Sequence, residues 1–60
     1  MIEVLTINGE RIAYPDHRVL SIRKNTRATW QLTLRSLINP SETKTIEVSQ
    51  WRRVPTNEWM

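Results

Sequence analysis

The sequence lacks cysteine and contains only one glycine and one histidine. Without cysteine, the chain cannot form a disulfide, and no thiolate is present to bind zinc. A lone histidine, His17, does not make a structural metal site, and a lone glycine, Gly9, does not make a glycine-rich phosphate loop. We therefore expect no metal and no cofactor. The absence of cysteine is compatible with a cytoplasmic location.

Long apolar runs are also absent. Signal peptides and membrane-spanning helices need such a run, so we expect neither and predict no membrane partner. The 60 residues correspond to a single small domain covering 1–60. A chain of this size buries only about 60% of its unfolded surface. Its stability must come from a compact core, and self-association into a homodimer is one way to enlarge that core.

No group of residues typical of a catalytic site is present. No serine has a general base at a spacing typical of a catalytic nucleophile–base pair. The glutamates are scattered over predicted turns and outward positions, so no pair of carboxylates emerges. His17 lies in a predicted turn directly after Asp16, and such sequence neighbours do not form a dyad by themselves. We therefore predict that the protein is not an enzyme.

Turn signals and alternating apolar residues are what the sequence does contain. Asn8-Gly9 separates a predicted strand at 2–7 from another at 10–14, and this dipeptide is typical of a two-residue type I′ turn with positive φ at both positions. Directly opposed residues share a face of the sheet. The predicted core face of this hairpin is Leu5, Ile7, Ile12 and Tyr14.

Three further strands are predicted after a break at Pro15-Asp16-His17, over 18–24, 29–36 and 44–51. A three-residue loop at 26–28 pairs Ile22 with Leu32 and Leu20 with Leu34. A short loop at 39–41 pairs Leu34 with Ile46 and Leu32 with Val48. These registers predict one shared core face: Leu20, Ile22, Trp30, Leu32, Leu34, Ile46 and Val48.

The fold predicted from these elements is all-β. Five short strands joined by tight turns indicate an antiparallel meander that forms a small SH3-like or OB-like barrel or a curled sheet. A closed barrel is favoured because it hides the edge strands. No segment has a sustained helical repeat, so no long helix is expected. Residues 52–60 are expected to form a C-terminal tail with at most one 3₁₀ turn.

Two sequence features point to a nucleic-acid ligand, in a chain of net charge +3 with seven arginines. The first is the predicted hairpin tip with Arg23, Lys24 and Arg27, since such side chains neutralise backbone phosphates. A charged turn that only keeps the protein soluble has the same composition.

The second feature is Trp51-Arg52-Arg53. Alternation from Ile46 and Val48 predicts that Trp51 points away from the core, where it would stack on a base while the arginines bind phosphates. The alternatives are that Trp51 covers the barrel end, or that a bulge turns it inward.

The remaining surface leaves two functions open. The outward face of the last three strands is polar and suits either a nucleic acid or a protein, and the terminal Trp59-Met60 either docks onto the barrel or a partner or stays free. The first hypothesis is a small nucleic-acid-binding barrel. The alternative is a protein-interaction module, which would be an adaptor, an inhibitor of a larger enzyme or a homo-oligomeric subunit.

Overall fold

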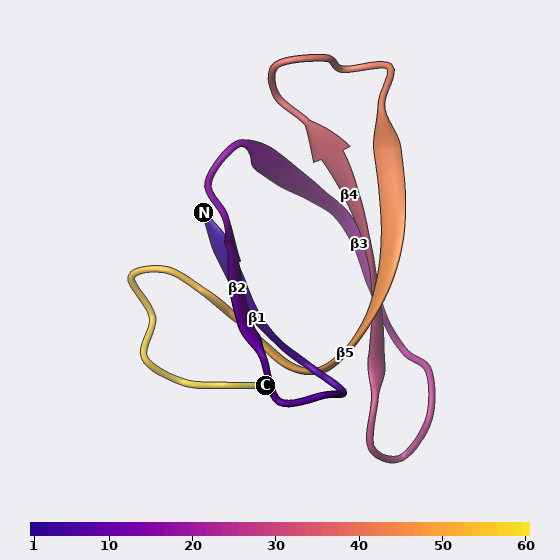
Figure 1. Ribbon diagram of the computed structural model, residues 1–60, viewed down its shortest axis with the longest axis vertical. Helices are drawn as coiled ribbons and strands as arrows, with labels where there is room; N and C mark the ends of the chain where they lie inside the picture. The colour runs from indigo at the N-terminus through magenta and orange to yellow at the C-terminus, as the bar shows by residue number, and fades with distance from the viewer.

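The computed structural model describes all 60 residues and contains five β-strands and no helix (Figure 1). The strands are β1 (Ile2–Thr6), β2 (Arg11–Tyr14), β3 (His17–Lys24), β4 (Trp30–Ser36) and β5 (Thr43–Arg53). They form one antiparallel sheet in the order β2-β1-β5-β4-β3. The prediction of an all-β chain with five antiparallel strands is therefore confirmed. No helix is present that is long and apolar enough to cross a membrane.

The sheet is curled but not closed. The long strand β5 lies at its centre and pairs with β1 on one side and with β4 on the other. β2 and β3 follow each other along the chain across a turn at Pro15–Asp16, yet they do not pair and form the two edges of the sheet (Figure 1). The meander is thus interrupted between β2 and β3, and this interruption leaves an open seam.

The core occupies the inner face of the curl, which we define by its five buried side chains. These are Ile2, Val4, Leu32, Leu34 and Val48. The opposite side of the sheet is called the outer face below. Each buried aliphatic side chain contributes about 1.5–3 kcal/mol relative to exposure. Partly buried side chains from β2, β3, β4 and β5 extend this core: Ile12, Tyr14, Val19, Ile22, Trp30, Ile46 and Trp51.

The first hairpin differs from its predicted register by one residue. Gly9 has φ +85°, but it is the only residue with a positive φ, so Asn8 does not adopt a type I′ turn. The Thr6 amide donates to the Glu10 carbonyl at 2.8 Å, which makes a three-residue loop. The Thr6 hydroxyl accepts a further bond from the Glu10 amide.

A one-residue slip turns every side chain of a strand to the other face. β1 therefore buries Ile2 and Val4, whereas Leu5 is only partly buried and Ile7 is 58% exposed. The prediction that Leu5 and Ile7 belong to the core is wrong. Ile12 and Tyr14 of β2 do pack against the core, as predicted.

The hairpin of β3 and β4 follows the prediction at its tip. Ile22 pairs with Leu32, and the three-residue loop 26–28 is confirmed by the Asn25 amide bonding the Thr29 carbonyl. Further along, the register shifts between Val19 and Ser21, so Val19 pairs with Leu34. The predicted pair of Leu20 with Leu34 is therefore wrong, and the bulged Leu20 is 42% exposed.

β4 and β5 pair two residues away from the predicted register. Leu32 lies opposite Ile46, because the loop is longer than expected and the Ser36 amide bonds the Glu42 carbonyl. The Ser36 hydroxyl accepts bonds from the amides of Ile38 and Asn39 and so stabilises this loop. Since the shift is even, the side chains of β4 and those of β5 up to Val48 keep their predicted faces.

A second bulge, at Ser49 and Gln50 of β5, decides the position of Trp51. The Ser49 hydroxyl donates to the carbonyls of Leu5 and Thr6 at 3.0 and 3.3 Å. Beyond the bulge, Trp51 lies on the inner face with its ring edge-to-face against Trp30, at 5.7 Å between centroids. The prediction that Trp51 points outward is wrong, and the bulge named as an alternative is the reason.

The C-terminal segment folds back onto the sheet. β5 extends to Arg53 and is followed by a turn at Val54–Pro55 rather than a 3₁₀ turn. Met60 then exchanges two backbone hydrogen bonds with Trp51, at 2.8 and 3.2 Å. The terminus consequently lies beside the β1–β2 hairpin (Figure 1). The sequence left open whether the tail docks onto the barrel, docks onto a partner or stays free, and in the structure it docks onto the sheet.

Candidate nucleic-acid interface

The six candidate residues from the sequence lie in three different places. Lys24, Trp51 and Arg53 lie on the inner face, and Arg52 lies on the outer face where the tail covers it. Arg23 lies on the exposed outer face of β3, and Arg27 lies in the exposed loop beyond it.

The inner group is a row of cations and indole rings. The Lys24 ammonium lies 4.3 Å from the centroid of the Trp30 ring, and the Arg53 guanidinium lies 6.0 Å from that of Trp51. The edge-to-face contact of the two indoles joins these pairs. Each cation–π contact at an exposed site is worth about 0.5–1 kcal/mol. Trp51 is partly buried between Trp30, Arg53 and the core, so it is not the outward-pointing ring that the sequence predicted.

Arg52 is fully engaged by groups of the protein itself. Its Nε and Nη2 bond one carboxylate oxygen of Glu3, at 2.8 and 2.7 Å. Its Nη1 donates to the carbonyl of Thr56 and to the Asn57 side chain, and its guanidinium lies 5.0 Å from the Trp59 ring centroid. Arg52 therefore anchors the C-terminal segment rather than standing free for phosphate.

The outer face of β3, β4 and β5 remains open. Register places its side chains in three rows across the strands. The rows are Arg18, Arg35 and Thr43; then Ser21, Thr33 and Thr45; then Arg23, Gln31 and Glu47. Hydroxyl side chains occupy the middle row, and the Thr33 and Thr45 oxygens lie 3.5 Å apart. Arginines stand at both ends of this surface, which we call the outer arginine face.

Arg18 and Arg35 are the pair on the outer arginine face that most favours binding of an anion. They are direct cross-strand partners, both are exposed, and neither has a carboxylate within ion-pair distance, since the only ion pair of the protein joins Arg52 to Glu3. Like charges directly opposite each other destabilise a sheet. An anion bound between them would remove that repulsion.

Sequence reasoning missed this pair for a definite reason. With unbroken alternation in β3, Val19 would lie beside Arg35, and Arg18 would face inward. The bulge at Leu20 reverses the parity and brings Arg18 to the outer face. No residue in the segment is a clear signal for a bulge, so only the structure reveals the pair.

Glu47 is the one acidic residue on this face, and its carboxylate already accepts hydrogen bonds from the protein. Its Oε2 accepts hydrogen bonds from the side-chain amide of Asn25 and, at 3.0 Å, from the Thr29 hydroxyl. Glu47 thus stabilises the loop between β3 and β4, in the row farthest from Arg18 and Arg35.

A comparison with known proteins does not assign the site. No family model, no curated protein and no solved structure matches the chain significantly. The geometry above is therefore the only basis for a functional proposal.

Proposed function

We propose that the protein binds nucleic acid on the outer arginine face. The observation that carries this proposal is the opposed pair of Arg18 and Arg35, exposed and without a carboxylate partner. Guanidinium groups bind phosphate through two parallel hydrogen bonds and remain charged at all physiological pH values. We propose that this binding involves no catalytic step and no metal, and that the protein acts in the cytoplasm.

The surroundings of this pair support a backbone-binding surface. Arg23 stands at the other end of the face, and Arg27 extends the positive charge into the loop. The hydroxyls of Ser21, Thr33 and Thr45 between them are donors of the kind that contact phosphate and sugar oxygens. No aromatic ring lies on this face, which favours contacts to the backbone over base stacking.

The tail also directs the ligand to this half of the sheet. Trp59 lies against Arg11 and Arg52 on the outer face of β2 and β5, at 5.5 and 5.0 Å from their guanidinium carbons. The outer face of the β1–β2 half is therefore partly covered, whereas the outer arginine face is not.

A salt titration tests the proposal. Fluorescence anisotropy with short single-stranded and double-stranded oligonucleotides, of DNA and of RNA, gives the binding constant at each salt concentration. If three arginines contact phosphates, the logarithm of the binding constant should fall against the logarithm of the salt concentration with a slope of about −2.1 for single strands and about −2.7 for B-form DNA. No binding to any of these probes at low salt would refute the proposal.

Matched variants locate the surface. Arg18→Gln and Arg35→Gln should each lower the magnitude of the slope by about 0.7–0.9 and weaken binding for all sequences. Arg11→Gln removes the same charge from the half that carries Trp59 and should leave the slope unchanged. If all three variants behave alike, net charge rather than this face determines binding.

A second candidate function is self-association. It is one form of the protein-interaction module that the sequence suggested as the alternative to nucleic-acid binding. The loop between β4 and β5 exposes two neighbouring apolar side chains, Leu37 at 60% and Ile38 at 79%. Exposed apolar patches mark interaction sites, although single exposed residues are common. Sedimentation velocity over a wide concentration range tests this candidate. A dimer that is lost in the double variant Leu37→Ser with Ile38→Ser supports it, and a monomer at all concentrations refutes it.

A further inference from the structure

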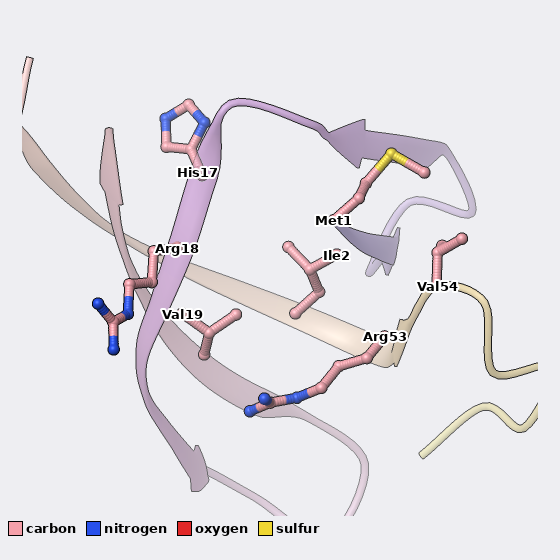
Figure 2. A pocket seen from close by; sticks show the side chains of 7 residues that line it. All are labelled: Met1, Ile2, His17, Arg18, Val19, Arg53 and Val54. Carbon is pink, nitrogen blue, oxygen red and sulfur yellow. The ribbon is translucent and has the colours of Figure 1, made fainter. Parts of the chain in front are cut away.

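The open seam contains a cavity of about 410 Å³ that the nucleic-acid proposal does not use. It lies between the start of β1, the first half of β3 and the end of β5 (Figure 2). Its lining residues are Met1, Ile2, His17, Arg18, Val19, Arg53 and Val54. The volume is within the range of about 300–1,000 Å³ that is typical of small-molecule sites. The cavity is open to solvent on one side.

The wall of the cavity combines apolar side chains with two arginines, Arg18 and Arg53. Ile2 and Val19 point toward each other from β1 and β3, and Val54 closes the side beyond β5 (Figure 2). The Arg53 side chain extends from the end of β5 toward β3, so that its guanidinium lies beside Val19 (Figure 2). No aspartate or glutamate lines the cavity.

The charge of Arg53 is uncompensated by the protein. Arg53 forms no ion pair, because the single pair of the structure uses Arg52, and its nearest aromatic partner is the Trp51 ring at 6.0 Å from the centroid. The bulge in β5 produces this contrast, since it sends Arg52 to the outer face and Arg53 to the inner face. An anion at the mouth of the cavity would meet an unpaired guanidinium.

We propose that this cavity binds a small organic anion. A carboxylate or phosphate group would pair with Arg53, because the planar guanidinium matches both in a two-bond geometry. A short apolar group of the same ligand would cover the accessible apolar side chains of Met1, Val19 and Val54, and its removal from water would add to the affinity. Arg18 borders both the cavity and the outer arginine face, but its guanidinium points to the other side of β3, away from that of Arg53 (Figure 2).

Four probes test the head group and the apolar part: hexanoate, hexyl phosphate, hexanamide and inorganic phosphate. The untagged protein should be used, because Met1 lines the cavity and Met60 bonds Trp51. Backbone amide shifts of Ile2, Val19 and Val54 in NMR spectra report occupancy. At least one of hexanoate and hexyl phosphate should bind tenfold or more tightly than hexanamide and inorganic phosphate, and the tighter of the two identifies the head group.

Three results with these probes would overturn the proposal. Equal affinity for hexanoate, hexyl phosphate and hexanamide would mean that the cavity does not recognise charge. Equal affinity for hexyl phosphate and inorganic phosphate, with hexanoate no tighter than hexanamide, would mean that the apolar wall takes no part. Absence of shifts with all four probes also refutes it.

A pair of variants assigns the anion contact to one residue. Arg53→Gln should abolish the preference for the charged probes and leave the weak binding of hexanamide unchanged. Arg11→Gln, which removes a charge away from the cavity, should keep that preference. Arg53→Gln should also retain oligonucleotide binding, because Arg53 is not on the outer arginine face. Retained preference in Arg53→Gln contradicts the proposal.

Discussion

The register of the first hairpin decides which isoleucine stabilises the protein, and one substitution at two positions measures it. Ile2 is 1% exposed and Ile7 is 58% exposed, although both lie within the segment that the sequence predicts to be a strand. Ile→Val removes one methylene group in each case. At Ile2 the loss creates a small void beside Val4 and should cost about 0.5–1.5 kcal/mol. At Ile7 the side chain is already in water, so the change should stay within about 0.5 kcal/mol.

Thermal unfolding followed by circular dichroism is sensitive enough for this comparison. In a domain of this size, about 1 kcal/mol lowers the melting temperature by about 4–8 °C. The total stability expected for 60 residues is about 3–9 kcal/mol, so Ile2→Val should remain folded. If Ile7→Val proves more destabilising than Ile2→Val, the hairpin has the type I′ register in solution, and the core described above is wrong.

Substitutions at three further positions test other features of the structure. Gly9→Ala should cost about 1–2 kcal/mol in thermal unfolding, because no atom crowds the position and only the left-handed φ is strained, and Gly9→Asn should cost less. Glu3→Gln should cost about 1 kcal/mol, because it removes the partner of Arg52, and the cost should shrink in high salt. Trp59→Ala removes two cation–π contacts worth about 1–2 kcal/mol together and should speed hydrogen exchange at the Trp51 amide, which bonds Met60. An unchanged exchange rate at that amide would mean that Trp59 does not hold the tail.

Alternation predicted the part of the sheet where strands run without interruption. In β4, Trp30, Leu32 and Leu34 all lie on the inner face, as their period of two requires. The loop at 26–28 was also predictable, because any even loop length would have set Ile22 against a polar residue. In β5 up to Val48, even the wrong loop length left the faces correct, because the error was two residues.

The errors about which face a side chain occupies have a common physical cause. In each case the register is shifted by one residue, and such a shift exchanges the two faces of the strand. A positive φ at Gly9 alone selects a three-residue loop, whereas the dipeptide Asn8-Gly9 also suits the two-residue turn. The bulges at Leu20 and at Ser49–Gln50 each insert one residue on one strand only. Hydrophobic pattern does not locate such an insertion, since an apolar residue such as Leu20 is tolerated at the exposed position. The pairing of β5 with β1 is a long-range contact that local patterns do not specify either.

The two bulges also determine where positive charge is available. In β3, the bulge turns Arg18 to the outer face opposite Arg35, and in β5 the bulge separates Arg52 from Arg53. Arg52 is consumed by Glu3 and the tail, whereas Arg53 reaches the cavity. Adjacent arginines in the sequence thus differ in role because one inserted residue sets their faces. The two proposed binding surfaces follow from the irregularities of the sheet, and a ligand that recognises either surface would depend on the bulged register as well as on the arginines themselves.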